Sequence, residues 1–141
     1  MKKKFLLACL ISAVFAAPAG AWELWDQFKA TNLTSEGRVV DYSEAKLITT
    51  SEGQSYGMFF ALVANDKKAF DEMFAWTEKN LGENQPAWLW GIPDGTPNGT
   101  GKILDTNNAT DSDMWIAYCL IEAASSSSKS LGRITVASSF R

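Results

Sequence analysis

The sequence predicts an all-α fold with long connections. Apolar residues recur at helical spacing in four segments, and each segment begins or ends with residues that cap or break helices. We expect these helices at residues 22–33, 51–64, 66–82 and 110–123. Extended structure is limited to short pieces in the loops, so no strand-rich region is predicted.

The first two predicted helices are short and amphipathic. In the first, Trp22, Trp25 and Phe28 follow one another at helical spacing. The start of the second has the pattern Ser51-x-x-Gln54, which is typical of a capping box. Its apolar residues include Met58, Phe59, Leu62 and Val63.

The third predicted helix forms an αα-hairpin with the second, because Asn65 and Asp66 end one helix and cap the next. Gly82 is expected to end it. Its inward face is predicted to comprise Phe70, Met73, Phe74 and Leu81. The fourth helix is expected to begin at Thr110-x-x-Asp113, another capping pattern. Its inward residues are predicted to be Ala117, Leu120 and Ile121.

The N-terminal segment predicts export. Three lysines precede an apolar run over residues 5–17, and Ala19-Gly20-Ala21 is the small-residue pattern that signal peptidase accepts. The run is shorter than the roughly 20 residues that span a bilayer. We therefore expect cleavage after Ala21, no stable membrane anchor, and a periplasmic or secreted protein.

Charge and composition exclude several functions. The chain has 13 Lys+Arg and 16 Asp+Glu, and removal of three lysines with the signal leaves a net charge of −6. This balance argues against nucleic acid and anionic membrane surfaces as partners. The absence of histidine excludes histidine triads and histidine-ligated zinc. Cys119, the one cysteine left after cleavage, lies among apolar residues and is interpreted as inert packing.

Carboxylates are then the best candidates for acid–base chemistry. Glu52 and Asp111 both lie at predicted helix starts beside polar loops. Glycoside hydrolysis uses one carboxyl group to protonate the leaving oxygen and another to activate water or stabilise the transition state. Trp88 and Trp90 lie in a long loop at 83–108, and long loops in compact domains are usually functional. Tryptophan rings there are suited to stack on the apolar faces of sugars.

Each candidate has a structural alternative. Glu52 in a first helical turn can simply complement the helix dipole, which favours the charged form and not the protonated form that a general acid needs. Asp113 can serve as a capping-box residue. Tryptophans are often core residues. Asp105-x-Asn107 lacks the glycine and distal glutamate of a calcium loop, so no metal site is expected.

Three ordered segments resemble motifs of glycoside hydrolase family 8. Residues 49–58, Thr-Thr-Ser-Glu-Gly-Gln-Ser-Tyr-Gly-Met, resemble its acid-bearing motif. Residues 86–91, Pro-Ala-Trp-Leu-Trp-Gly, resemble the tryptophan loop of the endoglucanases found in bacterial cellulose-synthesis operons. Residues 109–117, Ala-Thr-Asp-Ser-Asp-Met-Trp-Ile-Ala, resemble the family signature, with Ser112 where the signature has alanine or glycine.

The resemblance implies an (α/α)6 barrel, with this chain as its N-terminal part, and an endo-β-1,4-glucanase that cleaves cellulose-type glucan with inversion. It implies no cofactor and no metal, and a functional link to the cellulose synthase machinery. By position, Glu52 matches the proton donor. Asp111 matches the signature aspartate, which is often labelled the nucleophile and which we expect to bind and distort the sugar. The residues expected to bind substrate are Tyr56, Trp88, Trp90 and Asp113.

The last stretch of the sequence differs from the rest. Residues 125–128 are a serine run, and residues 129–141 lack helical periodicity, which predicts a disordered or frameshifted tail over residues 125–141. The predicted organisation is therefore a signal peptide at 1–21, the N-terminal part of the family 8 domain at 22–124, and the tail. The water-activating aspartate of the family is expected outside this chain. The alternative function is an inactive fragment with at most weak glucan binding.

Overall fold

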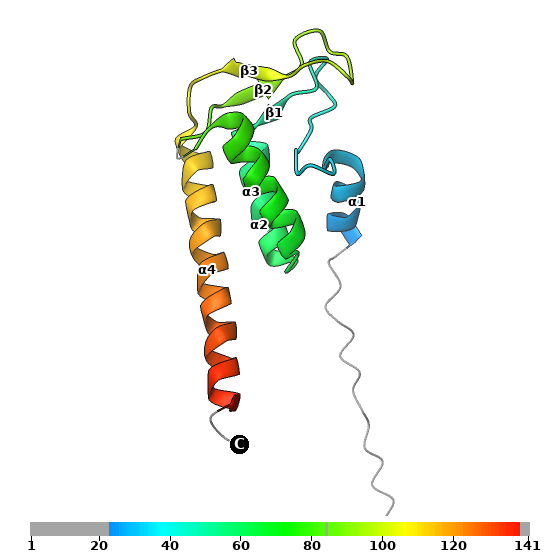
Figure 1. Ribbon diagram of the computed structural model, residues 1–141. Coiled ribbons are helices and arrows are strands. Elements are labelled where there is room, and N and C mark those ends of the chain that lie inside the picture. Colours follow the sequence, from blue (N-terminus) through cyan, green and yellow to red (C-terminus); the bar gives the residue numbers. More distant parts are fainter. Residues whose placement is uncertain (1–22, 84, 139–141) are drawn as a thin grey trace, which may run out of the picture.

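Four helices and a three-stranded sheet make up the computed structural model, which describes residues 23–83 and 85–138. The elements in chain order are α1 (Glu23–Asn32), β1 (Thr49–Thr50), α2 (Ser51–Val63), α3 (Lys67–Leu81), β2 (Leu89–Gly91), β3 (Lys102–Asp105) and α4 (Thr110–Ser138). Figure 1 shows the sheet lying across one end of the helices. The chain is mostly helical, as predicted, with a small sheet added.

The sheet corrects the all-α prediction, because two of its strands lie in the segment expected to be a loop. β2 is the central strand and is antiparallel to both β1 and β3. Thr49 lies opposite Trp90, and Gly91 lies opposite Lys102. Strands of two to four residues are too short to show an alternating pattern in the sequence. Pairing between distant segments forms them instead.

The start of α2 is capped by Thr50 and not by the predicted pair Ser51 and Gln54. Thr50 has extended backbone angles (φ −103°, ψ 153°), and its side chain accepts a hydrogen bond of 3.0 Å from the Gly53 N–H. The N-cap position normally combines extended backbone with a side-chain acceptor. Because β1 runs directly into the helix, Thr50 already has this conformation. Gln54 is buried and bonds elsewhere.

Asp66 caps α3 as predicted and also joins it to α1. Its carboxylate accepts hydrogen bonds from the Ala69 N–H at 3.1 Å, from Trp25 Nε1 at 3.1 Å and from Lys29 Nζ at 2.9 Å. Burial alone would raise the pKa of Asp66, but the bonds from Lys29, Ala69 and Trp25 outweigh burial and lower it. The contact therefore stabilises the fold above the ordinary carboxyl pKa, and this stability is lost as the pH falls through the lowered value.

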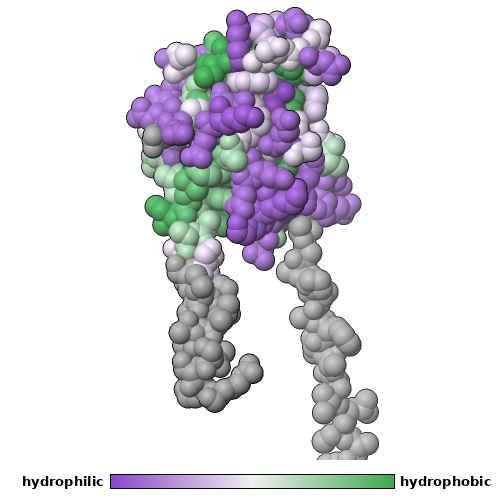
Figure 2. Space-filling view, in the orientation of Figure 1, coloured by the Kyte–Doolittle hydropathy of each residue, from purple (hydrophilic) through white to green (hydrophobic). Residues whose placement is uncertain are grey.

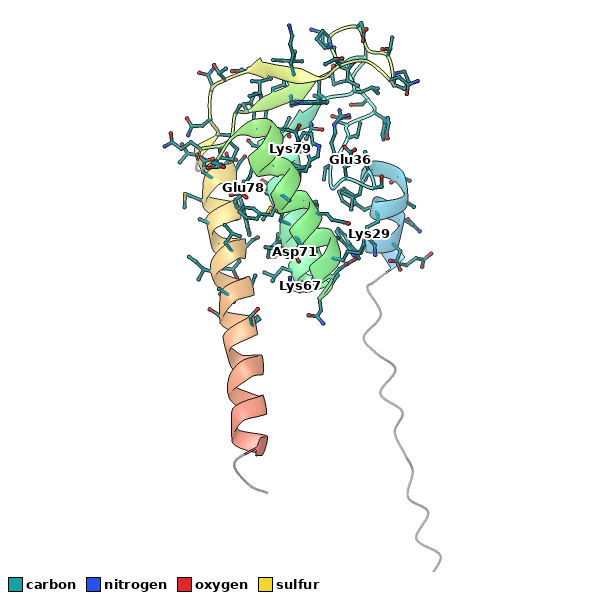
Figure 3. The ribbon with its side chains drawn as sticks, in the orientation of Figure 1. Lys29, Glu36, Lys67, Asp71, Glu78 and Lys79 are labelled. Atoms are coloured by element: carbon teal, nitrogen blue, oxygen red, sulfur yellow. The ribbon has the colours of Figure 1, made fainter. Side chains whose placement is uncertain are left out.

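The outer face of α3 carries charged side chains, some of which Figure 3 labels. Lys67 pairs with Asp71, and Lys68 pairs with Glu72 at 2.6 Å, one helical turn apart in each case. Exposed pairs of this kind contribute little to stability. They mark α3 as a solvent-facing helix whose other face packs on the core.

The main core lies between α1, α2, α3 and α4. Its buried residues are Trp25, Val39, Met58, Ala61, Ala69, Phe70, Met73, Ile116 and Cys119. The third helix packs on its predicted face. The predicted inward face of α4 is wrong in part, because Ile116 and Cys119 are buried while Ala117 is exposed and Ile121 is 64% exposed. Val63, an apolar residue of α2, is 55% exposed.

The final helix is longer than predicted. We expected it to end at Ala123, but α4 continues to Ser138, so the described part of the predicted unstructured tail is helical. The Ser127 hydroxyl donates to the Ala123 carbonyl at 3.0 Å, a bond that lets serine sit within a helix. Residues 1–21, which carry the predicted signal peptide, lie outside the described residues. Among the helices of the described chain, none is both long and apolar enough to cross a membrane.

Gly37 is the tightest point in the packing of the 34–37 turn on α3. Its φ is +88°, and a Cβ there would lie 2.2 Å from both the Glu72 carbonyl carbon and oxygen. We expect Gly37→Ala to lower the free energy of unfolding by about 3 kcal/mol, because backbone strain and a backbone clash combine.

The matched control for Gly37 is Gly82. It also has positive φ, at +109°, but a Cβ there would have no atom within 4 Å. Gly82→Ala should therefore show the cost of strain alone, about 1 kcal/mol. Urea denaturation followed by circular dichroism measures both. Equal losses for the two variants would contradict the clash at Gly37.

Candidate active site

The backbone of Trp88 joins the two segments that carry the candidate acids. Its carbonyl accepts a 3.0 Å hydrogen bond from the N–H of Ser51, the residue before Glu52. Its own N–H donates to the carbonyl of Asn107, which lies four residues before Asp111, at 2.5 Å. The starts of α2 and α4 consequently lie at the same end of the molecule, beside the sheet (Figure 1).

Glu52, Tyr56 and Asp111 come together at these two helix starts. Tyr56 lies one turn after Glu52 on α2, and its ring meets that of Trp115, one turn after Asp111 on α4, with centroids 6.1 Å apart. Burial raises the pKa of the Tyr56 hydroxyl, and the negative charges of Glu52 and Asp111 raise it further. The structure therefore brings together three of the six residues that the sequence indicated for the site.

An open groove of about 530 Å³ adjoins Asp111. The residues that line it are Phe59, Asp111, Met114, Trp115 and Tyr118. The Trp115 ring lies at its centre, with ring centroids at 5.0 Å from Phe59 and 5.9 Å from Tyr118. Sequence reasoning identified only Asp111 here. The positions 111, 115 and 118 share one face of a helix, and this spacing is the signal that could have found the aromatic residues.

The side chain of Trp90 packs beside the strand that leads into α2. The Arg38 guanidinium lies over its ring, 4.2 Å from the centroid, and the Trp76 ring meets it edge-on at 5.4 Å. Arg38 also donates through Nε to Thr49 Oγ1 at 2.8 Å, across the strand pair from Trp90. A Cβ at Gly101 would lie 1.8 Å from the ring, so only glycine fits beside it. Arg38 was missed by sequence reasoning.

Asp113 lies on a different side of α4 from the groove. Its Oδ2 accepts from Asn108 Nδ2 at 2.8 Å, and its N–H donates to the Ala109 carbonyl, so the predicted capping box with Thr110 does not form. Its other oxygen is buried with no hydrogen-bond partner among the described residues. Asp113 lines a hollow of about 220 Å³ together with Phe74, Thr77, Glu78 and Pro86. The structure does not bring Asp113 to Asp111's groove.

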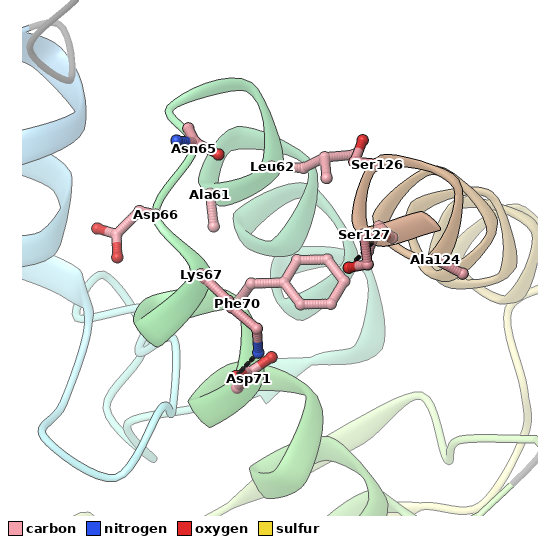
Figure 4. A pocket seen from close by; sticks show the side chains of 11 residues that line it. Ala61, Leu62, Asn65, Asp66, Lys67, Phe70, Asp71, Ala124, Ser126 and Ser127 are labelled. Atoms are coloured by element: carbon pink, nitrogen blue, oxygen red, sulfur yellow. Dashed lines mark hydrogen bonds and ion pairs between the residues drawn. The ribbon is translucent and has the colours of Figure 1, made fainter. Parts of the chain in front are cut away.

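A second hollow, of about 420 Å³, lies at the other end of α2 from Glu52 (Figure 4). It is formed by the α2–α3 turn and by α4 between Ala123 and Ser127. Its carboxylates are already engaged, since Asp66 binds Lys29 and Asp71 pairs with Lys67. Both carboxylates of this hollow are therefore held in ion pairs.

Thiol and metal chemistry find no support at this site. Cys119 is fully buried, and burial raises its pKa to about 11, which confirms the interpretation as inert packing. Within residues 23–83 and 85–138, no group of histidine, cysteine, aspartate or glutamate side chains is arranged to hold a metal ion.

Comparison with known proteins identifies the family of the chain. The family model described as glycosyl hydrolases family 8 matches residues 1–138. An endoglucanase of Escherichia coli O157:H7 is 49% identical over 124 residues, which cover 84% of this chain and 33% of that protein. An endoglucanase of Salmonella typhi is 49% identical over 119 residues, or 81% of this chain and 31% of that protein.

Solved structures show the same relationship. The endo-1,4-D-glucanase of Vibrio fischeri ES114 has a TM-score of 0.64 and 56% identity, over 72% of this chain and 30% of that one. The endo-beta-1,4-glucanase CMCax of Acetobacter xylinum has a TM-score of 0.61 and 37% identity, over 77% of this chain and 33% of that one. The chain thus spans about a third of the length of its relatives. Because the family model matches nearly the whole chain, the protein belongs to glycosyl hydrolases family 8.

Proposed function

We propose that the protein is an endo-β-1,4-glucanase that hydrolyses internal bonds of cellulose-type glucan with inversion of the anomeric centre. The observation that carries this proposal is that the starts of α2 and α4, which carry Glu52 and Asp111, lie together at an aromatic groove that Asp111 lines, in a chain of family 8. Two carboxyl groups flanking the scissile bond are what both classes of glycosidase need. The printed names of the relatives support the substrate class.

Each group has a distinct role in the proposed reaction. Glu52 donates a proton to the glycosidic oxygen as the bond to the anomeric carbon breaks. Asp111 binds the sugar at the cleavage point and stabilises its distorted, positively charged transition state. The rings around Trp115 present apolar surfaces to the faces of neighbouring sugars. In this proposal the carboxylate that activates water comes from the part of the family domain that this chain does not span.

We further propose that the four helices belong to an (α/α)6 barrel. Large apolar side chains are exposed on the two helices that carry the acids, away from the rings around Trp115: Val63 on α2 and Ile121 on α4. Figure 2 shows apolar surface gathered over α4. Exposed apolar patches of this kind mark surfaces that pack against other elements. Further barrel helices would cover these side chains and close the groove.

Export to the periplasm, and a functional link to cellulose synthesis, are parts of the same proposal. Export is supported by the lysine-rich start, the apolar run and the small residues at 19–21. The link to synthesis is supported by the resemblance of residues 86–91 to the tryptophan loop of the cellulose-synthesis endoglucanases.

Hydrolysis of carboxymethyl cellulose tests the proposed activity. The assay compares the chain alone with the chain joined to the remaining two thirds of the E. coli relative, and it measures reducing ends over time. We expect the joined protein to release reducing ends internally, and proton NMR of early products from cellohexaose to show the α-anomer, as inversion requires. A joined protein that folds but releases no reducing ends, beside an active E. coli relative, would contradict the proposal.

A further inference from the structure

Arg38 lies where three parts of the chain meet beside the start of α2. Its Nε donates to Thr49 Oγ1 at 2.8 Å, and its Nη2 donates to the carbonyl of Leu47. Its guanidinium also lies over the Trp90 ring, 4.2 Å from the centroid. Thr49 and Trp90 are partners in the antiparallel pair of β1 and β2. One side chain therefore connects the segment before β1, β1 itself and β2.

Leu47 has a backbone conformation that needs contacts to fix it. Its φ is +48°, in the left-handed region that residues other than glycine rarely adopt. Such residues persist where the surrounding structure fixes them, and they cluster at functional sites. The bond from Arg38 to the Leu47 carbonyl is a contact of this kind. Because Leu47 lies two residues before Thr49, its conformation sets the direction in which the chain enters β1.

The start of α2 follows β1 without a break. Thr50 ends β1 and caps α2. The Ser51 N–H donates to the carbonyl of Trp88, just before β2, at 3.0 Å. Ser51 is fully buried, and Glu52 is the next residue. The position of the Glu52 backbone therefore depends on how β1 lies against β2, and Arg38 contacts both strands.

The shape of the guanidinium, more than its charge, suits Arg38 to this place. None of the ion pairs in the described part of the chain includes Arg38. Its partners are instead a hydroxyl, a carbonyl and the face of an indole ring. The planar group of arginine can donate in two directions and stack on an aromatic ring, whereas the ammonium of lysine is a compact point charge. Lysine at this position would keep the charge and lose the geometry.

The Trp90 ring is packed against other protein groups. Arg38 covers one face, and the Trp76 ring meets it edge-on with centroids 5.4 Å apart. The ring also packs against the buried cluster of Trp76, Leu81 and Ala87. A cation over an aromatic face is attracted by the ring, so this face of the indole is engaged by Arg38 and is not open to a sugar. The packing makes Trp90 the support for Arg38.

We propose that Arg38 is a positioning residue for the acid: stacked on Trp90, it fixes β1 and thereby sets the position of Glu52. This inference rests on the proposed glucanase function, because that function gives Glu52 the role of acid. It departs from the expectation that Trp90 binds substrate. Neither Arg38 nor Trp90 touches the glucan in this proposal, and both act on the reaction through Glu52.

Hydrogen exchange in the chain as it stands tests the positioning. The exchange rates of the Ser51 and Gly53 amides are measured by NMR in the unaltered chain, in Arg38→Lys and in Lys46→Arg. We expect both amides to exchange at least about tenfold faster in Arg38→Lys, while amides in the middle of α3 keep their rates. Lys46→Arg is the matched control, because it makes the reverse exchange at an exposed position of the same segment and should change neither rate.

Two results of this measurement would overturn the proposal. The first is unchanged exchange at Ser51 and Gly53 in Arg38→Lys. The second is an equal increase in α3, because Arg38 would then support the whole fold and not the start of α2 in particular.

The kinetics of the joined protein separate positioning from substrate binding. For Arg38→Lys we expect kcat to fall about tenfold with KM within about twofold, because a misplaced acid slows the chemical step and leaves glucan binding unchanged. A tenfold rise in KM with kcat unchanged would make this a glucan-binding site and overturn the proposal, as would kinetics equal to those of the unaltered joined protein. A joined protein without glucanase activity would instead contradict the proposed function, while hydrogen exchange still decides whether Arg38 fixes the start of α2.

Discussion

Glu52→Gln is expected to lower kcat for carboxymethyl cellulose by a factor of about 10² to 10⁴, the range that a positioned general acid contributes. Glutamine has nearly the same size, but it has no acidic proton to give to the leaving oxygen. Release of reducing ends by the joined protein described above measures the loss. The unfolding temperature should stay within a few degrees, because Glu52 is only partly buried.

The same variant distinguishes catalysis from the structural alternative at this position. If Glu52 only complements the dipole of α2, its neutralisation costs about 0.3–1 kcal/mol of stability and leaves hydrolysis intact. Glu36→Gln provides the matched control, because Glu36 is an exposed glutamate in the turn before Arg38, away from the groove. Hydrolysis that survives in Glu52→Gln as it does in Glu36→Gln would remove Glu52 from the role of acid.

The acids of the candidate site could be predicted because their signals are local. Glu52 and Asp111 each lie in a short contiguous pattern at a helix start, and helix starts are marked by capping residues within the same few positions. The partners of these acids depend on where α2 and α4 meet. No local pattern reports that Tyr56 lies against Trp115, since the two residues belong to different helices.

The face of α4 was misassigned for a related reason. Apolar residues surround this helix, so more than one helical face fits the spacing. The face that is buried includes Ser112 and Cys119, a polar and a small residue that sequence reasoning did not favour. The exposed face includes Met114 and Ile121, which we propose other barrel helices would cover.

Gln54 shows how a polar residue can be central to the fold without any signal in the sequence. It is fully buried in α2, and its Oε1 accepts from the Val39 N–H at 2.6 Å. Its Nε2 lies within hydrogen-bond distance of the carbonyls of Gly37 and Met73, both at 3.1 Å, and of Thr77 Oγ1 at 2.9 Å. One side chain thus satisfies backbone groups of the 37–39 segment and of α3.

Gln54→Ala should consequently lower the free energy of unfolding by about 4 kcal/mol, because it leaves buried backbone groups at Val39 and Gly37 without partners and opens a cavity. Total stabilities of domains are about 5–15 kcal/mol, so this loss is a large part of the whole. Gln27→Ala is the control, since Gln27 is exposed and bonds only weakly to Glu23 at 3.3 Å. Urea denaturation of both variants gives the comparison. A loss below about 1 kcal/mol at Gln54 would mean that water replaces its hydrogen bonds and that the 37–39 segment is not anchored through this side chain.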